Sequence, residues 1–269
     1  MTKIITFAAI KGGVGKTTLA YNFGSWLANR NRKILFIDFD HQCNLSQTYN
    51  IYDQKGSVGN ILRPENEVII QHVADNIDLI AGDMHLDDIE TTIENKTNKN
   101  MMLYLWLYDN YEKSNISSYD YIIIDCHPDF STATKNAIIV SDDILSPITP
   151  SEYGYKAKYN LQERIKELKE EAIDFTSHKS YVTANLYFVA NMLKHNTTSS
   201  RELLESLRQE KEAGDDSCIA YVPYKELFNK SELNKISLSE MNKDHKLALQ
   251  QRKFFTEIFQ TFENIEKTL

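Results

Sequence analysis

Three continuous apolar runs in the chain each lead into polar residues. They are IITFAAI (4–10), KILFIDFD (33–40) and YDYIIIDCHPD (119–129). Unbroken runs of β-branched and aromatic residues are typical of strands that are buried on both faces of a parallel sheet. Because ligands of open α/β sheets bind beyond the carboxyl ends of the strands, the polar residues after each run are candidates for a functional site.

Shorter apolar runs predict further strands at 77–81, 143–148, 182–190 and 218–222. The segments between the strands predict helices at 17–30, 99–113, 152–172 and 197–212, and a long amphipathic helix at about 243–268. Strand and helix alternate, and no shift in composition marks a domain boundary. The pattern therefore predicts one α/β domain over residues 1–269, with a mostly parallel β-sheet flanked by helices.

Composition narrows the range of functions. The 269 residues are 42% apolar and carry a net charge of −8, which argues against a broadly basic nucleic-acid binder but not against a local basic patch. No apolar run has the length of a membrane span, and the N-terminal segment lacks the pattern of a signal peptide. We therefore expect a cytoplasmic protein with three reduced cysteines, Cys43, Cys126 and Cys218.

The segment AAIKGGVGKTT (8–18) has the order strand, glycine turn and helix start that a phosphate-binding loop requires. Backbone N–H groups from Gly13 to Thr17 are expected to face an anion at the helix N-terminus. Lys16 is expected to reach the β- and γ-phosphates, and the Thr17 hydroxyl to hold Mg²⁺. The alternative is a glycine-rich turn with a surface lysine. The candidate nucleotide-binding residues of this segment are Lys11, Gly12, Gly13, Val14, Gly15, Lys16, Thr17 and Thr18.

The loop departs from the common pattern G-x-x-x-x-G-K-[ST], which requires a glycine where this chain has Ile10. A second lysine, Lys11, precedes the glycines instead. Lys11 is poorly placed to serve the same phosphates as Lys16. A second cation is useful if it reaches a nucleotide held by another subunit, in the manner of an arginine finger supplied in trans.

The motif K-G-G-V-G-K-T-T is that of the deviant Walker A ATPases, and the chain resembles the ParA/Soj-type DNA-partition ATPases of the MinD/ParA superfamily. The resemblance implies a P-loop NTPase fold that binds ATP and Mg²⁺ and forms a face-to-face homodimer in the ATP state. It implies that Lys11 contacts nucleotide across this dimer and acts in catalysis with Lys16. It also implies nonspecific DNA binding on the nucleoid, with slow hydrolysis stimulated by a ParB-like centromere-binding partner.

Two acidic motifs follow the apolar runs. DFDHQCN (38–44) resembles the switch D-x-D-P-Q-G-N of that family, which implies that Asp40 acts in catalysis by orienting the attacking water or the magnesium shell. Gln42 and Asn44 are then switch residues. YIIIDCHPD (121–129) resembles a Walker B strand, which implies that Asp125 holds Mg²⁺ through water; a buried structural carboxylate is the alternative.

Histidines replace prolines of both motifs, at His41 and His127, and Cys43 replaces a glycine. Together with Cys126, these side chains include two imidazoles and two thiols, a donor set that binds zinc. Their spacings, H-x-C and C-H, are not those of a known structural zinc site. Ordinary side chains in a polar cleft are therefore the alternative.

Weaker resemblances concern the base, the dimer surface and DNA. YFVANMLKHNTT (187–198) and YVPYKELFNKSEL (221–233) resemble base-binding segments, which implies that Asn191 reads the adenine edge and Pro223 lies against the ring; plain strand-to-loop turns explain both equally well. SPITPSEYGYK (146–156) is expected at the dimer surface. Basic residues of the C-terminal half are candidate DNA contacts, although acidic neighbours also suit a solvated helix face. These residues are Lys194, Arg201, Arg208, Lys225, Lys230 and Lys235.

The C-terminal segment has one apolar stripe, formed by Phe254, Ile258, Phe262, Ile265 and Leu269. A membrane anchor would fit a MinD-like, membrane-associated regulator of cell division, the alternative function. The near-neutral polar face favours docking onto the protein body instead, so we expect no membrane partner. An ATP-dependent reductase with an iron–sulfur cluster requires a cysteine pair that cannot be placed in this chain. A tyrosine autokinase requires a terminal tyrosine cluster, and residues 225–269 contain no tyrosine.

Overall fold

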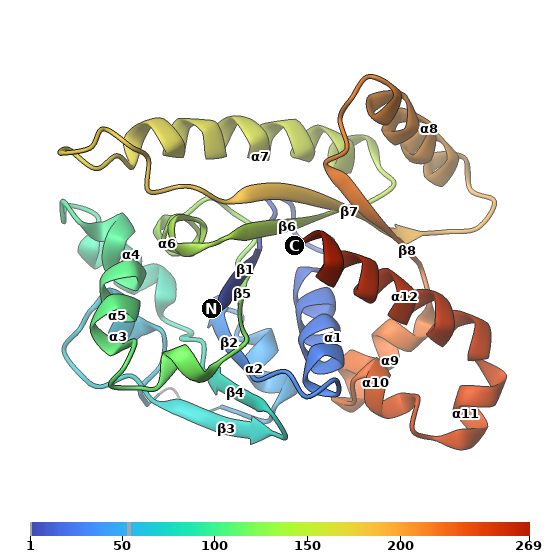
Figure 1. Cartoon of the computed structure of the whole chain (residues 1–269), viewed down its shortest axis with the longest axis horizontal. Helices are drawn as coiled ribbons and strands as arrows, with labels where there is room; N and C mark the ends of the chain where they lie inside the picture. Colours follow the sequence, from blue (N-terminus) through green and yellow to red (C-terminus); the bar gives the residue numbers. More distant parts are fainter. Residues whose placement is uncertain (1, 53–54) are drawn as a thin grey trace.

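The computed structural model describes residues 2–52 and 55–269, and its described part contains one eight-stranded sheet (Figure 1). The strands have the spatial order β3-β4-β2-β5-β1-β6-β7-β8, and neighbours are parallel except for the antiparallel pair β3 and β4. In chain order they are β1 (Lys3–Phe7), β2 (Ile34–Phe39), β3 (Ile70–Ala74), β4 (Ile77–Ile80), β5 (Tyr121–Cys126), β6 (Asp143–Ile148), β7 (Asn185–Leu193) and β8 (Cys218–Pro223). The predicted α/β class with a mostly parallel sheet is confirmed.

All of the predicted strands are present, and the differences have local causes. The first run, predicted over 4–10, ends as a strand at Phe7, because the following residues form the glycine loop. The run predicted at 182–190 lies at Asn185–Leu193. The sequence analysis missed the edge strand β3, whose residues IQHVA are only partly buried and form no continuous apolar run.

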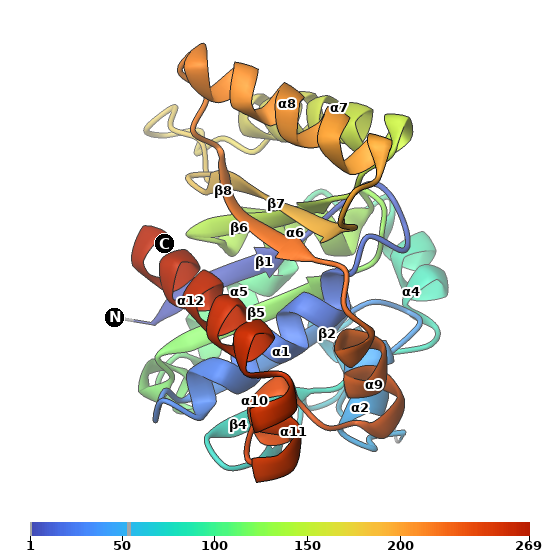
Figure 2. The same cartoon turned by 90° about the vertical axis from the view of Figure 1, so that its right-hand side faces the viewer.

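Helices cover both faces of the sheet (Figures 1 and 2). Helices α1, α9, α10 and α12 bury the core on one face, and helices α3 to α8 bury the cores on the other. The helices are α1 (Lys16–Ala28), α2 (Asn44–Thr48), α3 (Gly59–Leu62), α4 (Leu86–Ile93), α5 (Met102–Asn110), α6 (Thr132–Val140), α7 (Glu152–Glu171), α8 (Thr198–Glu212), α9 (Glu226–Asn234), α10 (Leu238–Met241), α11 (His245–Gln250) and α12 (Arg252–Thr268), with 3₁₀ turns at Lys99–Met101 and Ile116–Ser118.

The C-terminal segment differs from the single helix predicted at about 243–268. It consists of α11 and α12, because the backbone leaves helical geometry at Gln251 (φ −113°, ψ 20°). The apolar stripe of α12 is buried against the body, with Phe262 and Ile265 only 1% and 3% exposed. Docking is therefore confirmed. In the described part of the chain, moreover, none of the helices combines the length and the apolar character that crossing a bilayer demands.

Candidate functional site

The glycine loop connects β1 to α1 at the centre of the sheet. Gly13 and Gly15 have left-handed backbone angles, with φ of 70° and 86°, which glycine adopts without steric cost. Helix α1 begins directly after Gly15, at Lys16, so its unpaired backbone N–H groups and the positive end of its dipole point to the loop. Lys16 itself is only 6% exposed. The arrangement forms an anion cradle with a buried cation at its base.

A pocket of about 630 Å³ opens at this loop. Its walls come from the glycine loop and the start of α1, from the segments that follow β2 and β5, from the carboxyl ends of β7 and β8, and from α9. Of the residues singled out in the sequence, the pocket is lined by Gly13, Gly15, Lys16, Thr17, Thr18, Asp40, Gln42, Asn44, His127, Asn191 and Pro223. The carboxyl ends of the strands thus bring residues far apart in sequence into one site.

Asp125 is the penultimate residue of β5 and is fully buried near Lys16. Neither of its carboxylate oxygens has a hydrogen-bond partner of ordinary geometry among the described residues, although the Thr17 hydroxyl is close enough to lower the pKa of Asp125. Burial raises the pKa of Asp125 well above its ordinary value, and the nearby Asp38 carboxylate raises it further, while the charge of Lys16 opposes the shift. A buried carboxylate with both oxygens unpaired is costly unless a cation satisfies it. The residues therefore fit a hydrated Mg²⁺ ion.

The two carboxylates of the DFD motif have different environments. Asp38 is opposite Asp125 in the β2–β5 register and accepts hydrogen bonds from Ser46 N and Ser46 Oγ, at 2.9 and 2.6 Å. Burial raises its pKa to about 7. Asp40 lies at the pocket wall, where its Oδ1 accepts a hydrogen bond from Gln42 N at 2.8 Å. Asp38 thus fixes helix α2, and Asp40 is the carboxylate that faces the ligand space.

Lys11 is placed apart from this pocket. Its Nζ donates a hydrogen bond to Ser151 Oγ at 3.0 Å, just before α7. Ser151 belongs to the segment 146–156, which the sequence analysis expected at a dimer surface. The two lysines of the loop therefore point to different surroundings, since Lys16 lines the pocket and Lys11 does not.

The side of the pocket opposite the switch motif contains residues to which the sequence analysis gave no individual role in nucleotide binding. They come from α9 and the segment before it, and they are Tyr224, Lys225, Phe228, Asn229, Glu232 and Lys235. The Thr18 hydroxyl donates a hydrogen bond to Glu232, which connects α1 to α9. The signal in the sequence was the resemblance of the segment 221–233 to a base-binding segment, which named Pro223 alone as a base contact.

The structure does not bring the six candidate DNA contacts together. Lys225 and Lys235 line the pocket, and Lys194 lies over the Tyr224 ring at 4.8 Å. Arg208 is paired on α8 with Glu205 and Glu212, at 2.7 and 3.6 Å. The remaining pair, Arg201 and Lys230, is exposed on α8 and α9, and Figure 2 shows α8 at the top of the molecule and α9 in its lower half.

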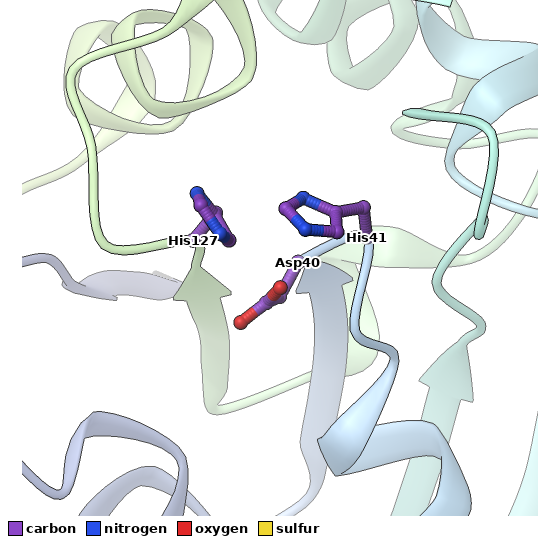
Figure 3. Close-up of side chains that lie close together, drawn as sticks. All are labelled: Asp40, His41 and His127. Atoms are coloured by element: carbon purple, nitrogen blue, oxygen red, sulfur yellow. The ribbon is translucent and has the colours of Figure 1, made fainter. Parts of the chain in front are cut away.

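The two cysteines of the zinc hypothesis do not join a group of metal-ligand type in the described part of the chain. Burial, reinforced by neighbouring carboxylates, raises the pKa of Cys43 to about 12. Burial also raises the pKa of Cys126, which packs in the core. The one group of metal-ligand type found among residues 2–52 and 55–269 is Asp40, His41 and His127 (Figure 3).

Comparison with known proteins identifies proteins that are similar to this chain in sequence and in fold. A family model described as an AAA domain matches residues 2–178. The chain is 31% identical over 166 residues to the sporulation initiation inhibitor protein Soj of Bacillus subtilis, which covers 60% of the chain and 64% of Soj. It is 31% identical over 218 residues to an uncharacterized Methanocaldococcus jannaschii protein, covering 77% of the chain and 79% of that protein. A candidate plasmid partition protein of Borrelia burgdorferi, solved with AMPPNP, has a TM-score of 0.80 at 24% identity, with both chains fully covered.

Proposed function

Because this chain belongs to the AAA domain family and resembles the Soj and ParA partition proteins, we propose that it is an ATP-dependent DNA-partition protein. In this proposal, ATP and Mg²⁺ drive two chains into a face-to-face homodimer that binds DNA without sequence preference on the nucleoid, in the cytoplasm. Slow ATP hydrolysis, stimulated by a ParB-like centromere-binding protein, releases the DNA. The observation that carries the proposal is the joint placement of the buried Lys16 and the unpaired Asp125 carboxylate at one glycine loop.

The chain's own groups account for nucleotide binding. The N–H groups between Gly13 and Thr17 hold the phosphates, and Lys16 neutralises their charge in a site with little water. Asn191 and Pro223 line the same pocket, and in this proposal they contact the base. These groups are preformed, so binding requires little reorganisation of the loop.

Thr17 and Asp125 are the residues that would hold the metal ion, with Asp40 at its outer shell. When bound, Mg²⁺ would neutralise the negative charge that develops on the phosphate oxygens during phosphoryl transfer. Asp40 accepts a hydrogen bond from Gln42 N, which fixes its carboxylate for orienting a water molecule. Positioning of this kind, rather than strong basicity, is what phosphoryl transfer to water requires.

The proposed protein partner and the proposed DNA cargo are inferred from the relatives of this chain. Besides Soj, the chain resembles the chromosome partitioning protein ParA of Myxococcus xanthus, at 30% identity over 173 residues. DNA binding would use phosphate contacts, for which the exposed Arg201 and Lys230 are the clearest remaining candidates. The buried stripe of α12 disfavours the alternative, a MinD-like membrane regulator.

ATP hydrolysis measured with and without nonspecific duplex DNA, across a salt series, tests the proposal. We expect slow turnover, and DNA binding that requires ATP and weakens steeply as the salt concentration rises. Lys16→Ala is the matched control, because it removes the buried cation and abolishes both effects. Wild-type protein that neither hydrolyses ATP nor binds DNA in its presence would overturn the proposal.

A further inference from the structure

The ends of β2 and β5 hold two histidines that the nucleotide chemistry does not use. Phe39 is opposite Cys126 in the parallel register, so the next positions, Asp40 and His127, also lie side by side. The His127 N–H donates to the Phe39 carbonyl at 3.2 Å, which fixes this approach. His41 follows Asp40, and its ring centroid lies 4.0 Å from that of His127. Figure 3 shows the three side chains converging from the two strand ends.

We propose that Asp40, His41 and His127 bind one transition-metal ion of the Zn²⁺ or Co²⁺ class, at a site that shares Asp40 with the outer shell of Mg²⁺ but uses two histidines that Mg²⁺ does not. One donor atom from each residue lies within 4.8 Å of the other two. A tetrahedral zinc ion with bonds of about 2.0–2.1 Å has donor atoms roughly 3.3 Å apart. Small rotations of the side chains close the difference. Asp40 and His41 are adjacent residues, and His127 is the neighbour of Asp40 across the strands.

The surroundings of the imidazoles support ligation. His127 Nδ1 is 3.1 Å from Asp129 Oδ2, so the tautomer that donates to Asp129 keeps the Nε2 lone pair for a metal. His41 Nδ1 is buried and forms no hydrogen bond with the described residues, although Asp87 Oδ1 lies 3.1 Å away. His41 Nε2 lies 3.1 Å from Gln42 Nε2, so the Gln42 side chain has to move before this nitrogen can bind a metal. A carboxylate beside each metal-binding imidazole is the usual arrangement around such ions.

The donor set selects the class of metal. Mg²⁺ binds oxygen ligands and keeps most of its waters, whereas imidazole suits zinc and its neighbours in the first transition series. Two imidazoles and one carboxylate leave an open coordination position for water or a phosphate oxygen. An ion at this site would engage Asp40, the carboxylate that we assign to water positioning. Zn²⁺ is therefore expected to inhibit ATP hydrolysis in the wild-type protein.

Calorimetric titration of the untagged, nucleotide-free protein with Zn²⁺, in buffer without Mg²⁺, tests the site directly. We expect one ion to bind per chain. When Co²⁺ is the probe, we expect the d–d absorption spectrum that is typical of an ion with a low coordination number. His41→Gln and His127→Gln should each weaken binding by about tenfold or more. His72→Gln is the matched control, because His72 is 71% exposed beside Asp78 and far from the cluster in sequence; this variant should bind as the wild type does.

Two results would overturn the proposal. One is wild-type protein that takes up no ion, or whose uptake is unchanged by both glutamine variants. The other is uptake that is lost in Cys43→Ser or Cys126→Ser but kept in the histidine variants, which would assign the donors to the thiols. Because the titration needs neither nucleotide nor hydrolysis, its outcome is independent of the proposed ATPase function.

Discussion

The side-chain amide of Asn191 donates a hydrogen bond to the carbonyl of Val14 over 2.8 Å, so strand β7 holds the glycine loop from the side. The contact requires a glycine at the next position. A Cβ atom on Gly15 would lie 2.6 Å from Asn191 Nδ2, and its φ of 86° disfavours any side chain. Asn191 is only 5% exposed. The amide nitrogen is therefore used on the loop, which leaves the amide oxygen for a ligand.

Asn191→Ala is expected to weaken ATP binding by about tenfold, because it removes a buried hydrogen bond worth about 1 kcal/mol and leaves the Val14 carbonyl unpaired. Calorimetric titration with a non-hydrolysable ATP analogue measures the change. Asn229→Ala is the control, since Asn229 lines the same pocket from an exposed position. Equal affinity in the wild type and Asn191→Ala would show that the contact does not shape the loop.

The central strands and the glycine loop could be predicted from sequence because their signals are local. Continuous apolar runs locate β1, β2 and β5, and the spacing of Lys16 and Thr17 after the glycines locates the loop. The distinct environments of Asp38 and Asp40 could not be predicted. They depend on Ser46, a contact eight residues away, and strand periodicity gives both carboxylates the same side.

The segment 221–233 was expected near the base, but the roles of its individual residues could not be predicted, since they require α9 to lie beside α1. Lys235 was assigned to DNA, but its Nζ donates to Asn50 Oδ1 and to the Tyr52 hydroxyl, at 2.7 and 2.6 Å. Such long-range pairings leave no periodic signal in the sequence. The break between α11 and α12 at Gln251 could not be predicted either, because the sequence at 243–268 contains no glycine or proline to mark it.

Lys11→Ala is expected to keep most nucleotide affinity but to lose ATP-dependent dimerisation. The reason is that Lys16, not Lys11, lines the chain's own pocket. Light scattering on a sizing column, with and without the ATP analogue, measures the mass. Ser151→Ala is the control, because it removes the contact that Lys11 makes within the chain and leaves the lysine in place. A Lys11→Ala protein that still dimerises with ATP would contradict the role across subunits.

Asp40→Ala is expected to bind ATP and accumulate as the dimer, with hydrolysis reduced by about 10²-fold or more, because water is no longer oriented. Single-turnover hydrolysis and sizing chromatography report the two effects separately. Gln47→Ala, a change at the same pocket but outside the switch motif, serves as the comparison. Normal turnover in Asp40→Ala would mean that another group positions the water.

Acid should destabilise the protein partly through Asp215. Burial acts in the opposite direction, but hydrogen bonds from Ser217 and Lys158 lower the pKa of Asp215 to about 2 from 3.8. A lowered folded-state pKa gives stability that is present above about pH 4 and lost as the pH falls through 2. The carboxylate is 37% exposed, so after allowance for solvent screening the contribution is about 1 kcal/mol.

Chemical denaturation between pH 5 and pH 2 measures this loss. Asp215→Asn should be less stable than the wild type at pH 5 and should show a shallower decline. Asp216→Asn is the matched control, since its carboxylate is 76% exposed and pairs with Lys211 at the surface. If the free energy of unfolding falls equally with pH in the wild type and in Asp215→Asn, the ion pair between Asp215 and Lys158 does not contribute to the acid sensitivity of the protein.

The final prediction concerns the docked C-terminal helix. Phe262 packs against Phe23 and Trp26, with ring centroids at 5.6 and 5.9 Å, and is 1% exposed. Phe262→Ala should lower the free energy of unfolding by about 3–5 kcal/mol, because it leaves a cavity between α12 and α1. Leu249→Ala, on the 62% exposed side chain of α11, should change it by less than about 0.5 kcal/mol. Phe262→Leu gives a smaller loss in the same direction if the alanine variant does not fold.

Because the same residue would face lipid in a membrane anchor, sedimentation with anionic liposomes separates the two roles. A docked helix leaves the wild-type protein in the supernatant with ATP present, whereas binding that is lost in Phe262→Ala would assign α12 to the membrane.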